Sequence, residues 1–217
     1  MAAYRFDEDF DGFLEDFGEP HDCIPISDLV VEAYRNKLPE QLFTYWRAFG
    51  ACGFHNGLFW IVNPAEYQDQ LDSWLEGTAF EKRTDLSVIT RTAFGVFYVW
   101  GKGKGVVMKI DPSVSLISHR VENDALSLTV EKENMEMRYF WGARGIEDVD
   151  ETDEDDKPLF GKALKKLGPL KSDEMYGFSH RLALGGKELL GNLDILKLGV
   201  YHDLAQQMEP PQIIEIS

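Results

Sequence analysis

The sequence predicts an α+β fold: a mainly antiparallel sheet flanked by helices, with a more helical C-terminal part. Three observations point to this fold class. Apolar residues recur at helical spacing over much of residues 6–75. Between residues 86 and 110 the pattern changes to β-branched and aromatic runs separated by glycine and lysine. Beyond residue 157, two further stretches favour helix.

Two helices are predicted before residue 37. The first ends near Gly18 and carries apolar residues at helical spacing with acids between them: Phe6, Phe10, Phe13, Leu14 and Phe17. The second begins at Ser27, because a serine side chain can cap the first turn, and runs to about Asn36.

A helix, a strand and another helix are predicted next. Pro39 is suited to the first position of a helix that ends at Gly50 and buries Leu42, Phe43, Trp46 and Phe49. The turn sequence at 55–57 leads into a strand over residues 58–62. Asn63 and Pro64 then start a helix that ends at Gly77 and turns Tyr67, Leu71, Trp74 and Leu75 inward.

The middle of the chain predicts strands. Residues 86–91, 94–100 and 106–110 are β-branched or aromatic, and 116–120 and 126–130 are expected to add two more. The sequence GKGKG at 101–105 lacks the spacing and the Ser/Thr of a phosphate-binding loop. We therefore expect it to be the turn of a hairpin.

The C-terminal part begins with an acidic tract, residues 147–156, in which eight of ten residues are acidic. A charge run of this kind is typical of a solvated loop or hinge. Residues 158–167 and 204–208 favour helix, the stretch 168–186 between them is predicted to be irregular, and the tail from Pro210 is predicted to be loose.

Composition narrows the possible partners. The 217-residue chain has 38 acidic and 22 basic residues, a net charge of −16, which repels nucleic acid and anionic lipid and favours a basic partner. No apolar run is long enough to span a membrane. Two cysteines form no disulfide framework, and the acidic start MAAYRFDEDF does not have the pattern of a secretory signal. We expect a cytoplasmic protein that binds neither nucleic acid nor membrane.

Catalytic and cofactor motifs are weak. No nucleophile elbow or zinc-protease motif is present, so we expect no enzyme and no cofactor. Asp7, Asp9 and Asp11 followed by Gly12 copy the first half of a calcium loop, but Gly18 stands where the bidentate acid is required. An amphipathic helix explains the same residues. The partial calcium loop leaves one alternative function, a calcium- or ligand-responsive regulatory module.

Two groups of motifs resemble known families. Residues 13–100 are similar to a GAD-like domain in the stretches FGEP (17–20), YWRAFG (45–50), GLFWIVNPAEY (57–67), WLEGT (74–78) and TAFGVFYVWG (92–101). Residues 159–207 resemble the C-terminal domain of type VI secretion immunity proteins in the stretches LFGKALKKLGPL (159–170), DEMYGF (173–178), LALGG (182–186) and YHDLAQQ (201–207). The expected domains are 1–110 and 111–217, which could pack as one body.

The resemblance implies an immunity protein that neutralises a cognate secreted DNase by stoichiometric binding, without chemistry. A DNase must attract phosphate, so an acidic inhibitor is complementary to it and is steered toward it. The expected contact residues are those of the acidic tract: Asp148, Asp150, Glu151, Asp153, Glu154, Asp155 and Asp156. One departure is the loop at 179–181, which has Ser-His-Arg where such proteins usually carry a proline; this changes a loop that could touch the partner, and so bears on which toxin is bound.

Overall fold

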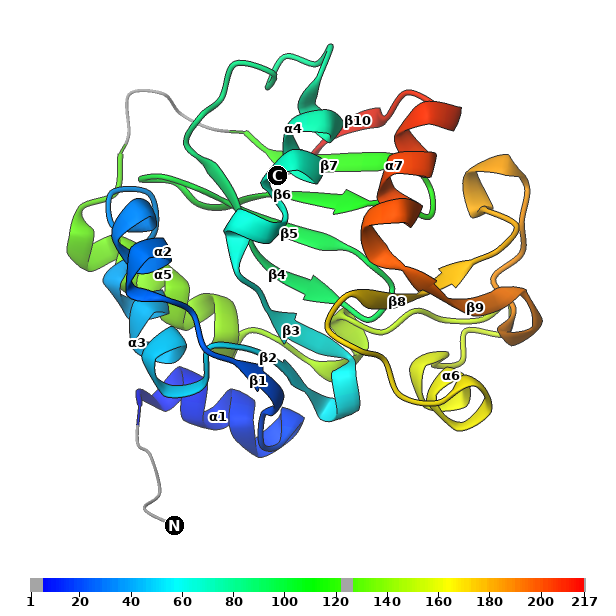
Figure 1. Cartoon of the computed structure of the whole chain (residues 1–217), viewed down its shortest axis with the longest axis horizontal. Coiled ribbons are helices and arrows are strands. Elements are labelled where there is room, and N and C mark those ends of the chain that lie inside the picture. The colour runs from blue at the N-terminus through cyan, green and yellow to red at the C-terminus, as the bar shows by residue number, and fades with distance from the viewer. Residues whose placement is uncertain (1–5, 122–126, 217) are drawn as a thin grey trace.

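An eight-stranded sheet runs through the computed structural model, which describes residues 6–121 and 127–216 (Figure 1). Its order is β1-β2-β3-β4-β5-β6-β7-β10, and every neighbouring pair is antiparallel except β7 and β10. The strands are β1 (His21–Ile24), β2 (Ala51–Phe54), β3 (Phe59–Ile61), β4 (Leu86–Thr92), β5 (Phe97–Gly101), β6 (Gly105–Asp111), β7 (Leu116–Arg120) and β10 (Gln212–Ile216). A second sheet pairs β8 (Glu174–Phe178) with β9 (Leu193–Lys197).

Helices cover both faces of the main sheet. The α-helices are α1 (Glu8–Phe17), α2 (Asp28–Tyr34), α3 (Glu40–Phe49), α4 (Gln68–Leu75), α5 (Val130–Gly142), α6 (Phe160–Leu167) and α7 (Leu198–Met208). Short 3-10 turns are η1 (His55–Gly57), η2 (Pro64–Glu66), η3 (Ile146–Asp148), η4 (Leu182–Leu184) and η5 (Leu190–Asn192). Figure 1 shows α4 and α7 in front of the sheet, α1 beside its β1 end, and α2, α3 and α5 grouped at the left of the view.

Strand alternation assigns the two faces. Successive residues of a strand point to opposite sides. On β5, Phe97 stacks on His202 of α7 with 4.1 Å between ring centroids, whereas Tyr98 meets Phe140 of α5 at 5.6 Å. Helices α4 and α7 therefore pack on one face and α5 on the other.

The predicted helix boundaries in the first 77 residues are largely confirmed. Ser27 caps α2 by accepting the Val30 N–H, and Asn63 caps η2 by accepting the Ala65 N–H. Gly50 follows α3 with φ of +74°, a conformation suited to glycine. Pro39 lies one position earlier than predicted, at the N-cap of α3. The hairpin at 101–105 is also confirmed, since it joins antiparallel β5 and β6.

An aromatic core lies between α1, α3, α5 and the sheet. Trp141 of α5 is fully buried at its centre, where its ring lies within 6.4 Å of six other rings: Phe10, Phe13, Tyr45, Phe54, Phe59 and Phe140. Helix α5 therefore packs on elements that precede it by about a hundred residues of chain.

Three buried polar side chains tie the C-terminal part to the main sheet. Arg91 of β4 donates to the Ser172 carbonyl at 2.8 Å, and Arg181 donates to the Pro112 carbonyl at 2.7 Å and to Ser115 Oγ at 2.6 Å. His202 of α7 is hydrogen-bonded to Trp74 of α4. The expected domain boundary at residue 110 falls within β6, and β7 and β10 continue the same sheet beyond it.

Three local predictions were wrong. Residues 127–129 form no strand, because Thr129 caps α5 by accepting the Lys132 N–H; Leu126 lies outside the described residues. The tail contains β10, since its isoleucines pair in parallel with the otherwise open edge of β7. The stretch 168–186 contains β8, which pairs with β9 and whose Met175, Tyr176 and Phe178 are buried.

Candidate functional site

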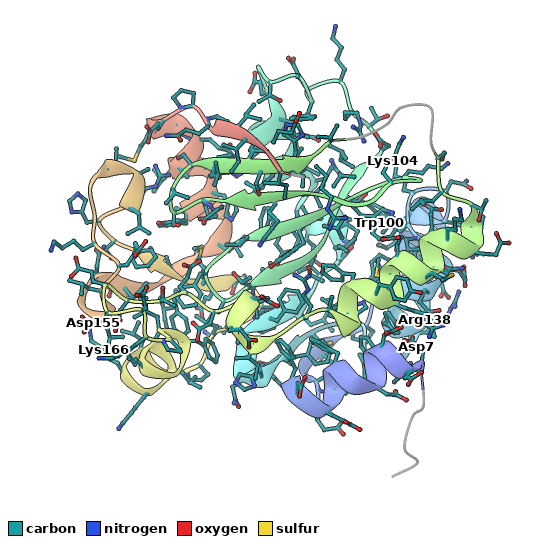
Figure 2. All side chains as sticks on the ribbon, turned by 180° about the vertical axis from the view of Figure 1, so that it is seen from behind. Asp7, Trp100, Lys104, Arg138, Asp155 and Lys166 are labelled. Atoms are coloured by element: carbon teal, nitrogen blue, oxygen red, sulfur yellow. The ribbon has the colours of Figure 1, made fainter. Side chains whose placement is uncertain are left out.

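One face of the sheet is left open beyond α5. In Figure 2, α5 lies in front of one part of the sheet, while β6, β7 and β10 are in view with no described helix over them. The register puts Tyr98, Lys109, Ser118 and Ile214 in one row across this face. We call the β6–β7–β10 part of this face the open sheet face, and two grooves meet on it.

The first groove is acidic. It has a volume of about 170 Å³ and lies between the sheet and residues 148–151, which cross it as a strap; its charged residues are Lys109, Asp111, Asp148, Asp150 and Glu151. Val149 is buried and holds the strap against the sheet. Asp150 Oδ1 accepts the Phe160 N–H at 2.8 Å, which joins the strap to the start of α6.

Two carboxyl groups of the strap are perturbed. Burial and the neighbouring acids Asp111, Glu188 and Asp150 raise the pKa of Glu151 to about 8, although Lys109 opposes this shift. Burial also raises the pKa of Asp150, against the backbone N–H groups that it accepts. At neutral pH Glu151 is therefore mostly protonated, and a cation entering the acidic groove would favour its ionised form.

The remaining acids of the tract lie in a separate surface turn closed by the bridge between Thr152 and Pro158. Asp153 pairs with Lys162 and accepts two backbone N–H groups, which lower its pKa to about 2. Glu154 pairs with Lys187 at 3.0 Å, Asp155 lies 3.5 Å from Lys157, and Asp156 is exposed. The predicted contact set is thus divided: Asp148, Asp150 and Glu151 line one groove, and the other four acids do not.

The second groove is basic. Its volume is about 270 Å³, and its cationic side chains are Lys109, Arg120 and Arg144. Lys109 Nζ lies 5.0 Å from the centroid of the Tyr98 ring, and Arg144 Cζ lies 5.6 Å from the same centroid. Tyr98 is 2% exposed, and its hydroxyl has no hydrogen-bond partner among the described residues.

The calcium-loop residues have structural partners. Asp7 caps α1 and accepts hydrogen bonds from Tyr45 Oη at 2.6 Å and Gln41 Nε2 at 2.8 Å. Asp7 and Asp9 each lie 3.4 Å from Arg138 Nε, and Asp11 accepts the Phe6 N–H. Within the part of the chain that the structure describes, no group of three or more His, Cys, Asp or Glu side chains is placed to hold a metal ion.

The loop at 179–181 has two exposed residues and one buried residue that binds the rest of the fold. Ser179 and His180 are exposed, but Arg181 is 5% exposed, and its terminal nitrogens donate to the carbonyls of Pro112 and Ala205 and to Ser115 Oγ. Its guanidinium is therefore not available to a partner.

Sequence reasoning missed the basic groove. Its cations are separated by up to 35 positions in the chain, and Tyr98 belongs to a strand whose composition is typical of a core. One local signal was present: Lys109 interrupts the apolar run Val106–Ile110, which places a charge on a strand expected to be buried.

Replacing Glu151 by Gln should change how stability depends on pH. A carboxyl whose pKa is raised on folding stabilises the fold at low pH, and this contribution is lost as the pH rises from 4.5 to 8. The Gln variant does not titrate and lacks this loss. The difference between its free energy of unfolding and that of the wild type should therefore shift in favour of the variant from pH 4.5 to 8 and stay constant above pH 8. Urea denaturation from pH 5 to 9 measures this, with exposed Glu147→Gln as the control. Parallel curves throughout would contradict the burial of the Glu151 carboxyl.

Comparisons with known proteins agree with the two-part architecture. Residues 8–113 match the GAD-like domain, and residues 135–209 match the family described as T6SS immunity protein Tdi1, C-terminal. The crystal structure of Atu4351 from Agrobacterium tumefaciens superposes with a TM-score of 0.84 at 21% identity, over 96% of this chain and 93% of that one. This similarity shows a shared fold. No curated protein matches the chain.

The immunity-protein match implies a non-enzymatic inhibitor that binds a secreted toxin. In the described residues every helix is too short or too polar to cross a lipid bilayer.

Proposed function

We propose that this chain, a GAD-like domain joined to the C-terminal domain of a type VI secretion immunity protein, binds a secreted DNase and blocks it stoichiometrically. The observation that carries the DNase assignment is the acidic groove on the open sheet face. Its strap supplies Asp148, Asp150 and Glu151 to a surface that no described helix covers.

The electrostatics support a basic target. A nuclease must attract the phosphates of DNA, so its surface near the substrate site is positive. The chain carries a net charge of −16, and its acidic groove holds four carboxyl groups around one lysine. Such complementarity speeds association and selects against acidic partners. A basic side chain of the toxin that enters the groove meets Glu151 and favours its ionisation.

Inhibition is tested by a cleavage assay with the effector encoded by the neighbouring gene. DNA cleavage should stop when the purified chain reaches one equivalent of the effector and should not be restored by more DNA if the complex is tight. Cleavage that continues at a several-fold excess of the chain would reject stoichiometric inhibition. A complex that forms with an effector that does not cut DNA would reject the DNase assignment alone.

Charge reversal of the strap should slow toxin binding. Asp148 is exposed at the rim of the acidic groove, so Asp148→Lys should reduce the association rate constant on the order of tenfold at low salt. The matched control is Asp16→Lys, which makes the same charge change on an exposed position of α1. Stopped-flow association at low and high salt separates the two. Equal rates for both variants would remove the strap from the interface.

A further inference from the structure

The basic groove is unexpected in so acidic a chain. Lys109, Arg120 and Arg144 gather at one hollow, and none forms a salt bridge among the described residues. Two of these cations flank one aromatic ring, that of Tyr98. Three like charges at one hollow repel each other, and Glu136 is the one acidic residue among the described ones that line it, so a second carboxylate entering the groove would be stabilised by the cations.

The groove also has an unpaired donor. The Tyr98 hydroxyl is buried and has no hydrogen-bond partner among the described residues, although Tyr98 lines both grooves. A buried hydroxyl without a partner destabilises the free chain, and an acceptor oxygen in the groove removes this penalty. The three cations and the Tyr98 hydroxyl would therefore both bind the same kind of ligand atom, an anionic oxygen.

Lys109 is the cation that lines both grooves. The carboxyl groups that face it across the acidic groove are Glu151, Asp150, Asp111 and Asp148, and Glu136 of α5 lines the basic groove. Burial raises the pKa of Glu151 to about 8, so this acid does not neutralise Lys109 at pH 7. The shift supports the charge argument, which rests on the positions of the three cations.

The surroundings favour a protein as the source of the anion. Tyr139 of α5 is 52% exposed beside the groove, and Ile216 of β10 is exposed at its edge. Exposed tyrosine and arginine with aliphatic neighbours are enriched where proteins bind each other. A volume of about 270 Å³ accommodates a side chain or two but lies below the usual range for a drug-sized ligand.

We propose that the basic groove receives an aspartate or glutamate side chain of the toxin, so that the interface is charged in both directions. This inference rests on the proposed function. The two grooves share Tyr98 and Lys109, so a partner that covers the acidic strap also reaches the basic groove. One groove then takes a basic side chain and the other an acidic one, which fixes the orientation of the toxin on the sheet.

Removing a cation from the basic groove should change toxin affinity in opposite directions under the two explanations. Arg144→Gln and Arg120→Gln each make the chain more acidic, so long-range attraction alone would strengthen its binding to a basic toxin. If the groove holds a toxin carboxylate, each variant should instead bind the catalytically inactive effector on the order of tenfold more weakly. The matched control is Lys165→Gln on α6, an exposed lysine away from both grooves, which should bind at least as tightly as the wild type.

A second variant separates binding from folding. Tyr98→Phe removes only the hydroxyl, so the free chain should melt at the same temperature or higher, by roughly 2–4 °C if the unpaired donor destabilises it fully. Its affinity for the inactive effector should fall by about tenfold, because the hydrogen bond to the toxin carboxylate is lost. A structural role would lower both quantities together.

The outcomes are distinct. Weaker binding by both Arg variants, with Lys165→Gln unchanged, supports the proposal. Unchanged or tighter binding by Arg144→Gln and Arg120→Gln overturns it, and the effect of Asp148→Lys still stands for the acidic interface. Failure of the wild-type chain to bind or inhibit the effector sinks the proposed function itself, and with it this inference.

Discussion

Replacing Trp141 by alanine should lower the free energy of unfolding by about 3–5 kcal/mol, the usual cost of removing a large buried aromatic side chain. Trp141 is fully buried, and its ring contacts include Phe13 at 4.8 Å and Phe10 at 5.2 Å. These partners lie on α1, so the substitution empties the junction between α5 and the first helix. Collapse into the space is limited on one side, where Phe54 of β2 and Phe59 of β3 belong to the sheet.

Tyr139→Ala is the matched control for this substitution. It lies two residues away on the same helix but is 52% exposed, so its free energy of unfolding should change by less than about 0.5 kcal/mol. Urea denaturation followed by circular dichroism measures both variants. If Trp141→Ala costs less than about 1 kcal/mol, α5 does not dock on α1 and α3 as described.

The same junction links folding to the proposed interface. Helix α5 carries Phe140, and Arg144, two residues beyond its last residue, donates its Nε–H to the Phe140 carbonyl at 3.1 Å. The wall of the basic groove is therefore positioned by the packing of Trp141, the residue next to Phe140. The C-terminal part of the chain, separated from α1 and α3, would lose this support.

Local signals predicted the helices in the first third of the chain because they act within one turn, whereas strands β1 and β2 were not predicted. Ser27 and Asn63 cap their helices by bonding N–H groups two or three residues away, and Gly50 ends α3 through its own backbone conformation. These interactions are encoded by neighbours in the sequence. Strand β10 is different. Its isoleucines form a strand because β7, almost a hundred residues earlier, offers an unpaired edge.

The candidate site shows the same division. The acidic tract was found because its charges are contiguous, but charge alone could not show that Val149 is buried and that the strap turns only some acids toward the sheet. The basic groove joins Tyr98, Lys109 and Arg144 from two strands and the end of a helix. Such a grouping depends on strand register and on where α5 docks, and neither can be read from spacing.

Acidification below pH 6.5 should destabilise the fold through His202. Trp74 Nε1 donates to His202 Nδ1 at 2.9 Å, and an indole N–H can only donate. The proton of the neutral ring therefore lies on Nε2, which donates to the Gly95 carbonyl at 3.0 Å. Protonating Nδ1 would set two donors against each other in a site that excludes water, and burial lowers the pKa of His202 to about 3.

Proton binding by His202 in the unfolded chain determines how the free energy of unfolding depends on pH. Above pH 6.5 the histidine is neutral in both states and contributes no pH dependence. Between pH 6.5 and 3 the unfolded chain binds a proton that the folded chain refuses, so the free energy of unfolding falls by about 1.4 kcal/mol per pH unit. From pH 6.5 to 4.5 the loss from this one group is about 2–3 kcal/mol. Carboxyl groups add their own effects at lower pH.

His202→Gln isolates this contribution. A glutamine amide can accept from Trp74 and donate to Gly95 but does not titrate, while it loses the stacking of the imidazole on Phe97. The variant should therefore be less stable at pH 7.5 and should lose less stability on acidification, so that the difference between the two proteins shrinks by about 1.4 kcal/mol per pH unit below 6.5. Urea denaturation at pH 7.5, 5.5 and 4.5 gives the three differences. A constant difference would mean that the folded protein admits the proton, which requires α7 to leave α4 without unfolding the sheet.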